Sequence, residues 1–218
     1  MYLQLAYDRL MGLLLYDNPV SSNALKARFM LAELGLSYET RTVPFDLPRP
    51  DWYLTVNKVG GIPALEDDGM VLAESQAILR YLAGREARDD LYPTSLRERA
   101  AVDELLDRWA ITFRPAFFRF EAPALGFVPG KGMGGGPPDL AALPAVAESI
   151  APLLRTLDAL VDESGYALGC FTIADVSAAP VLYRTAHTGL DLSPYPNVER
   201  WRDTLVARPA FAAAGPVL

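Results

Sequence analysis

Residues 57–78 read NKVGGIPALEDDGMVLAESQAI, and the order of signals in this stretch decides the fold. Asp68-Gly69 is a turn pair between two apolar runs, which predicts a β-hairpin over residues 63–72. Glu74 and Ser75 come directly after the second strand, and a helical pattern of apolar residues begins behind them. The stretch therefore predicts an X-Pro bond, a strand, a turn, a strand, an acidic-hydroxyl pair and a helix.

The end of this stretch has the chemistry of an anion site. Backbone amides at a helix N-terminus have no partner within the helix, and the helix dipole there favours negative charge, so a nearby hydroxyl completes a site for an anion. The Ile62-Pro63 bond leaves the backbone of Ile62 unpaired by the strand that follows, and X-Pro bonds are sometimes cis. A peptide-like ligand could pair with Ile62 while its carboxylate lies on Ser75.

This arrangement resembles the glutathione-binding half of the glutathione S-transferase family, which is a thioredoxin-like domain. In the family, the residue before a cis-proline pairs with the cysteinyl backbone of glutathione. An acidic-Ser pair at the next helix start holds the γ-glutamyl end. The resemblance gives the first role to Ile62 with Pro63 and the second to Glu74 with Ser75, and it implies that the Ile62-Pro63 bond is cis.

Composition limits the class of protein. The chain has 218 residues, 51% of them hydrophobic, so it can bury a core as one large domain or two small ones. Its net charge of −7 argues against a nucleic-acid or anionic-membrane partner, since both need a basic face. A single cysteine, Cys170, excludes an intrachain disulfide and indicates a reducing compartment. A single histidine excludes a His-rich metal site. The sequence has no run of about 18 apolar residues, so it predicts no membrane-spanning helix. We expect a cytoplasmic protein without a metal.

The rest of the chain predicts two domains. Residues 1–84 give strand, helix, strand, hairpin and helix, a βαβ-ββα order with a four-stranded mixed sheet. A charged linker covers 85–94, and helical periodicity dominates 95–218. This matches the family's architecture, an α/β thioredoxin-like N-terminal domain followed by an all-α helical-bundle C-terminal domain that carries a hydrophobic co-substrate site. Residues 1–11 are a possible extra segment, because the family usually begins with a methionine just before its first strand, and here that would be Met11.

Local sequence signals predict where helices and loops begin and end in residues 95–218. The runs Ser95–Glu98 and Thr172–Asp175 are capping-box signatures, and the second resembles the N-capping box of the family's second domain. Pro115 should kink or end the long helix that follows the first box. Residues 123–138 predict a mobile loop rather than a phosphate-binding loop, since the spacing of their glycines does not fit a Walker A motif. Residues 195–209 resemble the family's last helix.

The start of the first helix carries the candidate catalytic group. Conjugation needs a thiolate, and a free thiol with a pKa of about 8.5 is mostly protonated at neutral pH. A hydroxyl donor and a helix N-terminus lower that pKa. The family keeps a Tyr, Ser or Cys here, and its spacing gives the catalytic role to Ser21, glutathione contacts to Ser22 and Asn23, and a basic position to Lys26. Ser22 would then cap the helix or make a secondary contact. The alternatives are that Ser21 is an ordinary N-cap, or that Tyr16, which we expect to pack in the core, activates the thiol.

Two departures from the family pattern stand beside this site. Gly61 occupies the position, two residues before the cis-proline, where members often have Gln, Lys or Arg in contact with glutathione. The Ser-Ser-Asn sequence over 21–23 also differs from the Ser-Ser-Cys of the maleylacetoacetate-isomerase branch, so that branch is not supported.

One aromatic segment of the long helix predicts the co-substrate pocket, which in the family faces the glutathione site. Its candidate residues are Phe113, Arg114, Phe117 and Phe118. Core packing is the alternative for each Phe. Arg114 and Arg119 could meet an anionic substrate, although a solvated or paired Arg is commoner. Cys170, which precedes a helix cap, is expected to be a buried structural thiol.

The resemblance implies a glutathione transferase, in which a glutathione thiolate held at Ser21 attacks an electrophilic small molecule, and it implies a homodimer. A glutathione-dependent thiol or peroxide reductase or an isomerase on the same fold is a second interpretation, which Asn23 at the helix start keeps open. A non-catalytic binding protein with this fold is a third, for which Gly61 leaves room. The residues do not identify the natural electrophile.

Overall fold

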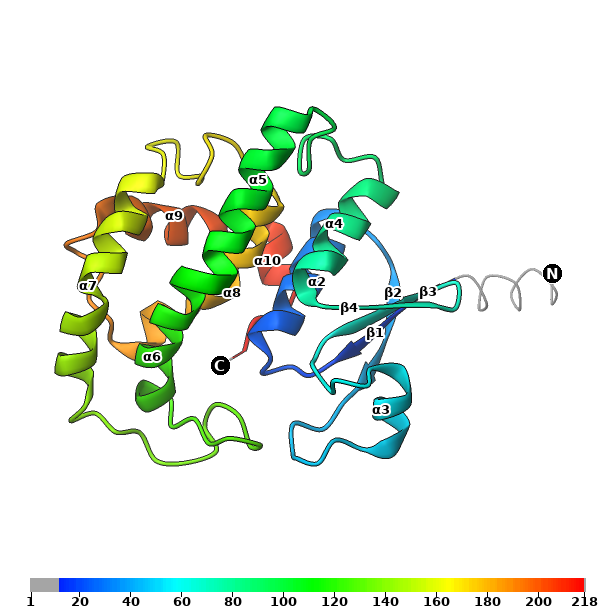
Figure 1. The fold of residues 1–218 in the computed structure, drawn as a ribbon, viewed down its shortest axis with the longest axis horizontal. Helices are drawn as coiled ribbons and strands as arrows, with labels where there is room; N and C mark the ends of the chain where they lie inside the picture. Colours follow the sequence, from blue (N-terminus) through cyan, green and yellow to red (C-terminus); the bar gives the residue numbers. More distant parts are fainter. Residues whose placement is uncertain (1–11, 218) are drawn as a thin grey trace.

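The computed structural model describes residues 12–217, in which a small mixed sheet lies beside a group of helices (Figure 1). The possible extra segment, 1–11, lies outside the described residues. The first elements are β1 (Leu13–Asp17), α2 (Ser22–Glu33), β2 (Tyr38–Thr42), α3 (Asp51–Val56), β3 (Ala64–Asp67), β4 (Met70–Ala73) and α4 (Ser75–Arg85). They are followed by α5 (Leu96–Arg108), η1 (Trp109–Phe113), α6 (Arg114–Ala124), α7 (Leu143–Leu160), α8 (Ile173–Thr188), α9 (Pro196–Val206) and α10 (Pro209–Ala213). The predicted fold class is confirmed. We call β1 through α4 the sheet half and α5 through α10 the helical half.

The sheet has the strand order β2-β1-β3-β4. β1 is parallel to β2 and antiparallel to β3, and β3 is antiparallel to β4. Successive side chains of a strand point to opposite faces, so Leu13 and Leu15 enter one core while Leu14 and Tyr16 reach the other. The first core continues into α2, α4 and the helical half, and the second is closed by α3. The predicted four-stranded mixed sheet is therefore present, with helices on both faces.

α8 is the central helix of the helical half, buried along most of its length because it packs against α2, α4, α5, α6 and α9. It begins with the predicted capping box, in which Thr172 Oγ1 accepts from the Ala174 amide (3.3 Å) and the Asp175 carboxylate accepts from the Thr172 amide (2.8 Å). The same carboxylate accepts from Trp201 Nε1 at 2.7 Å, and this bond joins α8 to α9. The box thus fixes both the start of α8 and a contact between two helices.

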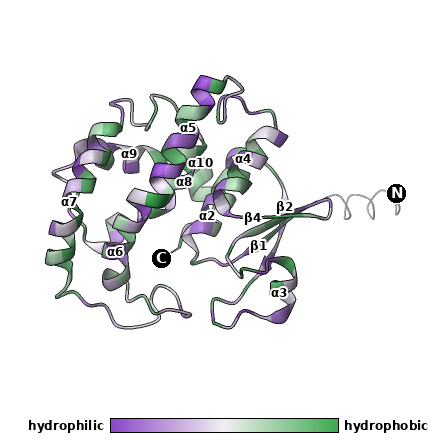
Figure 2. Ribbon diagram, in the orientation of Figure 1, coloured by the Kyte–Doolittle hydropathy of each residue, from purple (hydrophilic) through white to green (hydrophobic). Residues whose placement is uncertain are grey.

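A π-helical turn, η1, joins α5 to α6. Pro115 has no N–H, and its ring would clash with the carbonyl of Ile111 in a regular α-helix. The turn is wider than an α-turn because the Arg114 amide donates to the carbonyl of Trp109, five residues back. The predicted break at Pro115 is therefore a π-helical turn within one continuous run. Figure 2 shows hydrophilic and hydrophobic bands alternating along α5, the pattern of a helix with one buried stripe.

Two local predictions were wrong, and one short helix was not predicted. Ser95 is the N-cap of α5 but makes no side-chain capping bond, since this turn is exposed and water can satisfy its amides. A further short helix, α10, follows the expected last helix because Pro209 starts it, and Phe211 packs edge-on against Phe29 of α2 at 5.2 Å between ring centroids. Cys170 is exposed, because the loop before α8 turns its neighbour Phe171 inward instead.

The Gly-rich segment over 123–138 begins as the last turn of α6 and continues as a loop that folds back on itself. Val128 and Gly132 form an isolated β-bridge, and the Gly136 amide donates to the Gly126 carbonyl at 2.9 Å. Gly126 has φ +59°, and a Cβ there would come within 2.0 Å of the Gly136 carbonyl oxygen, so glycine is required. A Cβ at Gly132 would lie 3.0 Å from the ring of Phe45, which places this loop against the sheet half.

Candidate functional site

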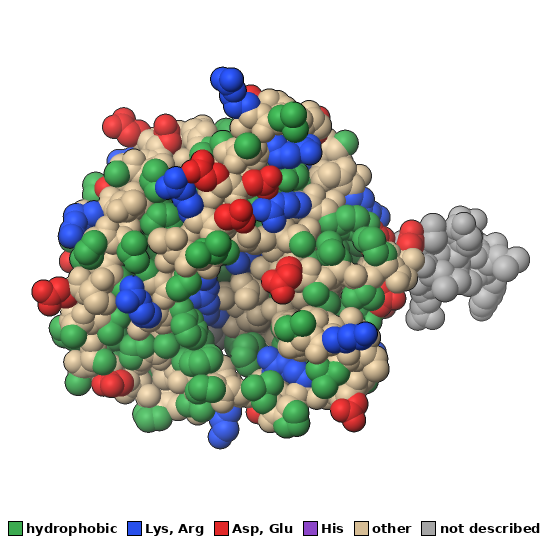
Figure 3. All heavy atoms as spheres, viewed as in Figure 1, with side chains coloured by type: hydrophobic (Ala, Val, Ile, Leu, Met, Phe, Trp, Pro, Cys, Tyr) green, Lys and Arg blue, Asp and Glu red, His purple; other side chains and the backbone are tan. Residues whose placement is uncertain are grey.

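A cleft of about 530 Å³ lies between the two halves, with the first turns of α2 and α4 on one side and η1 with α6 on the other. Figure 3 shows a hollow near the middle of this face with basic side chains beside it. The cleft is lined by Asn23, Lys26, Glu74, Ser75, Gln76, Ala77, Arg80, Ala110, Arg114, Pro115 and Phe118. Five of the predicted site residues are among them: Asn23, Glu74, Ser75, Arg114 and Phe118.

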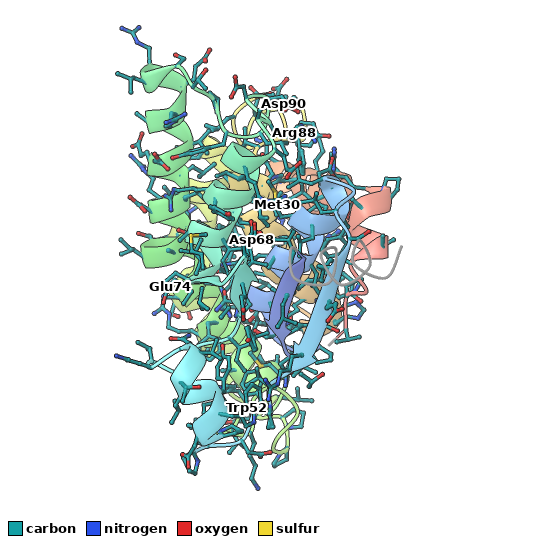
Figure 4. The ribbon with its side chains drawn as sticks, turned by 90° about the vertical axis from the view of Figure 1, so that its right-hand side faces the viewer. Met30, Trp52, Asp68, Glu74, Arg88 and Asp90 are labelled. Carbon is teal, nitrogen blue, oxygen red and sulfur yellow. The ribbon has the colours of Figure 1, made fainter. Side chains whose placement is uncertain are left out.

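The sheet half contributes the N-terminus of α4 to this cleft. Glu74 precedes the helix with φ +69° and ψ 112°, a backbone conformation that costs a non-glycine residue on the order of 1–3 kcal/mol. The conformation turns the chain from β4 into α4, and in Figure 4 Glu74 lies on the side that faces α5 and α6. No side chain caps α4, so its first amides and the Ser75 hydroxyl can serve an anion in the cleft.

Ser21 and Ile62 are brought together next to this cleft. Ser21 is the N-cap of α2, and its Oγ accepts from the Ala24 amide at 3.2 Å. The same hydroxyl donates to the Ile62 carbonyl at 3.5 Å, a long contact that leaves the proton available for a better acceptor. The two residues are 41 positions apart in sequence and 7% and 9% exposed. The Ile62-Pro63 bond is cis, as predicted.

Ser22 points toward the helical half instead. Its Oγ accepts from Nη2 of Arg114 at 3.3 Å, and it is 6% exposed. Of the two roles expected for Ser22, capping α2 is excluded, because Ser21 occupies the N-cap position and neighbouring side chains on a helix point about 100° apart. Ser22 is therefore tied to Arg114 of α6, and a contact of Ser22 with glutathione stays a prediction.

Lys26 is a buried amine in the lining of the cleft. It lies one helical turn beyond Ser22 and is only 4% exposed. The pKa of Lys26 is lowered to about 7, chiefly by burial and in smaller part by the positive charge of Arg114, while the carboxylate of Glu74 opposes both. The sequence had marked Lys26 only as the family's basic position, because burial cannot be inferred from the spacing.

Phe113 and Phe117 do not line the cleft, which corrects half of the predicted co-substrate pocket. They are 3% and 1% exposed, and Phe117 packs against Trp109 at 5.7 Å between ring centroids. Residues four apart on a helix share a face, so Phe113 and Phe117 belong to one face and Arg114 and Phe118 to the next. The first face packs in the core and the second faces the cleft.

Sequence reasoning missed Gln76 and Arg80, which also line the cleft. Gln76 Nε2 donates to the Leu106 carbonyl at 3.0 Å, and Arg80 Nε forms an ion pair with Asp103 at 2.8 Å. Both bonds tie α4 to α5. The two residues are four apart and so share one face of α4, but that face begins one residue after Ser75, so the helical period from Ser75 does not lead to them.

Two further residues near the site are structural. Tyr16 packs in the core as predicted and donates to Glu66 at 2.7 Å, and burial together with Glu66 raises the pKa of Tyr16 to about 12. The Gly61 carbonyl accepts from Asn57 Nδ2 at 2.8 Å. A Cβ at Gly61 would have its nearest neighbour 3.7 Å away, so the backbone does not require glycine there.

Two further findings concern only residues 12–217. Residues 12–217 contain no group of three or more His, Cys, Asp or Glu placed to hold a metal ion. None of the helices they form has both the length and the apolar character needed to cross a bilayer.

Comparisons with known proteins agree with this geometry. Residues 11–84 match the family model of the glutathione S-transferase N-terminal domain, and residues 140–204 match that of the C-terminal domain. The chain is 34% identical to glutathione S-transferase 3 of Zea mays over 207 residues, covering 90% of each protein. It is 31% identical to glutathione S-transferase GstB of Escherichia coli K12 over 195 residues, covering 87% of this chain and 91% of that protein. A glutathione-bound theta class glutathione S-transferase structure from Xanthomonas axonopodis pv. citri superimposes with a TM-score of 0.80 and 27% identity, covering 95% and 99%.

Proposed function

The chain belongs to the glutathione S-transferase family, and we propose that it conjugates the thiolate of glutathione to an electrophilic small molecule. The relatives described above are named glutathione S-transferases, and glutathione is its co-substrate. One observation carries the assignment of residues: Ser21 Oγ meets the Ile62 carbonyl beside a cleft that contains Glu74 and Ser75. In this proposal, Ser21 with Ile62 forms one end of a site for an extended tripeptide, and Glu74 with Ser75 forms the other.

The proposed binding mode follows from the groups at each end. The γ-glutamyl carboxylate lies on the Ser75 hydroxyl and the first amides of α4, where the helix dipole favours an anion. The γ-glutamyl ammonium pairs with the carboxylate of Glu74. The cysteinyl backbone pairs with Ile62, ahead of Pro63. Asn23, which lines the cleft, and Ser22 lie on the neighbouring turn of α2.

Ser21 activates the thiol in this proposal. A thiolate beside Ile62 is a stronger acceptor than the Ile62 carbonyl, so the Ser21 hydroxyl turns to donate to it. That hydrogen bond and the N-terminus of α2 both stabilise the anion and lower the pKa of the thiol. The electrophile approaches from the opposite wall, which Arg114 and Phe118 form.

The proposal includes the organisation of the protein. We place the thioredoxin-like glutathione-binding domain in residues 1–84, the linker in 85–94 and the helical domain in 95–218. A homodimer in the cytoplasm is the family's usual form. It is supported by the exposed Met70 and Val71 on the edge strand β4, 45% and 40% exposed, which a second chain could cover. Sedimentation that gives the mass of one chain at micromolar concentration would count against the dimer.

The test begins with retention on immobilised glutathione, followed by conjugation of 1-chloro-2,4-dinitrobenzene and reduction of hydroxyethyl disulfide. We expect retention and conjugation. Retention without either activity would indicate a non-catalytic binder, and disulfide reduction alone would indicate a reductase.

Two single variants then test the serine assignment. Ser21→Ala should bind glutathione almost normally, because Glu74 and Ser75 are untouched, but its bound thiol should titrate at higher pH and react more slowly. Thiolate absorbance against pH checks this in both serine variants. If Ser22→Ala shifts the thiol pKa and Ser21→Ala does not, the assignment is off by one residue. If neither shifts it, the serine mechanism is wrong.

A further inference from the structure

A cluster of buried charges supports the wall of the cleft that α6 forms. Glu121 is 1% exposed, and neither of its carboxylate oxygens has a hydrogen bond. Two guanidinium groups approach the same oxygen, Arg114 Nη1 at 3.5 Å and Arg184 Nη1 at 3.8 Å. Arg184 is 4% exposed and also donates to the Val20 carbonyl at 2.6 Å. One buried carboxylate therefore faces two cations.

Arg114 is the member of this cluster that reaches the cleft. Its side chain is 18% exposed, whereas those of Glu121 and Arg184 are 2% and 4% exposed. Because Glu121 is shared with Arg184, the charge of Arg114 is only partly neutralised from behind. The cleft is thus locally basic in a chain whose net charge is −7, so this basic character is not a consequence of composition.

The contacts of Arg114 place it beside the first turn of α2. Its Nη2 donates to Ser22 Oγ at 3.3 Å, one residue after Ser21. Its guanidinium carbon lies 5.2 Å from the ring centroid of Phe118, which is one turn further along α6 and also lines the cleft. A single wall therefore offers an aromatic surface and a positive charge within reach of the first turn of α2.

We propose that Arg114 is a specificity-determining residue that selects electrophilic co-substrates carrying a carboxylate or a similar anionic group, with their apolar part against Phe118. The inference rests on the proposed function. A guanidinium matches a carboxylate with two parallel hydrogen bonds, which favours this class over neutral molecules of the same shape. A carboxylate of glutathione is the other source of such an anion. We favour the co-substrate because the proposed anchors of glutathione, Glu74 and Ser75, lie on the opposite wall.

The experiment compares two electrophiles that differ in charge at one position, 4-chloro-3,5-dinitrobenzoate and 4-chloro-3,5-dinitrobenzamide. In both, the thiolate sulfur forms a bond to the ring carbon and chloride leaves with its electron pair. The measured quantity is kcat/KM for each electrophile, for the wild type and for Arg114→Gln. We expect the substitution to lower kcat/KM for the benzoate about tenfold to a hundredfold more than for the benzamide, the factor for losing a hydrogen bond to a charged group.

Two variants are matched controls. Arg119→Gln makes the same change on the same helix at an exposed position outside the cleft lining, and it should leave both values unchanged. Arg114→Lys keeps the charge but loses the paired geometry, so it should recover part of the preference for the benzoate.

Several outcomes would overturn the inference. One is an equal loss of kcat/KM for both electrophiles. Another is a rise in the KM for glutathione that is the same with either electrophile, which would assign the anion to glutathione. If Arg114→Gln does not fold, the wild type decides: unreactive 3,5-dinitrobenzoate should inhibit more strongly than 3,5-dinitrobenzamide, and equal inhibition would refute the inference. Failure of the proposed function is distinct, since the wild type would then conjugate neither electrophile.

Discussion

Replacing Lys26 with methionine should change how the stability of this protein depends on pH. Lys26 is 4% exposed, and burial lowers its pKa from 10.5 to about 7. That value includes a smaller lowering by the charge of Arg114 on α6 and an opposing rise from Glu74 at the start of α4, and Arg80 lines the same cleft. Methionine fills a similar volume without a charge, so the comparison isolates the titration of one amine.

The sign and size follow from that difference in pKa. One pKa unit corresponds to about 1.4 kcal/mol, so a shift from 10.5 to about 7 makes the charged amine cost about 5 kcal/mol in the folded state. The full cost applies below the folded pKa, where the amine is charged in both states. It disappears above the unfolded pKa, where the amine is neutral in both. Between the two, the unfolded state binds the proton and the folded state does not, so the stability of the wild type rises with pH.

Urea unfolding at one protein concentration, without glutathione, measures the effect at pH 7, 8 and 9. Lys26→Met should be the more stable protein at pH 7. Its advantage over the wild type should shrink by about 1.4 kcal/mol between pH 8 and pH 9, since the slope for one proton is 2.303RT per pH unit. Lys58→Met, at an exposed position, should give a difference from the wild type that does not change with pH. A constant difference for Lys26→Met would refute the reasoning and show that this amine keeps its ordinary pKa.

Three further predictions follow from single residues. Ser75→Ala should weaken glutathione binding by about 1–3 kcal/mol, the range for losing a charge-assisted hydrogen bond, and unchanged affinity in calorimetry would remove Ser75 from the site. Thr172→Ala should lower the free energy of unfolding by about 0.5–2 kcal/mol, because it removes the N-cap of α8; equal urea midpoints and slopes would contradict this. Cys170 should react with a thiol reagent in the folded protein almost as fast as in urea, because it is exposed, and strong protection would show that the loop covers it.

Local signals in the sequence were sufficient for the backbone of the sheet half. The turn pair Asp68-Gly69 places β3 and β4, and Glu74-Ser75 marks the start of α4, as the structure has them. The capping box at Thr172 likewise predicted the start of the central helix. These features depend on residues within a few positions of one another, so their physics is contained in a short stretch of chain.

In the helical half, local signals in the sequence were not sufficient to predict the structure. The sequence predicted a break at Pro115, since a proline always lacks the amide, but it could not show that a π-helical turn would absorb the break. It predicted a capping bond of Ser95 that does not form and the burial of Cys170, which is exposed, because exposure depends on which other elements cover a residue.

Some residues of the candidate site could likewise be predicted from the sequence, and others could not. The order of signals in the sequence singled out Ile62 and Glu74, and the family resemblance chose Ser21 over Ser22 and supplied the roles of all three. Only the tertiary structure decided that Arg114 faces the cleft while Phe117, three residues further along the same helix, lies in the core. It also decided that Lys26 is buried beside Arg114. The physical reason is that a helix repeats every 3.6 residues whatever surrounds it, so the sequence gives its faces but the packing of distant helices selects which face is covered.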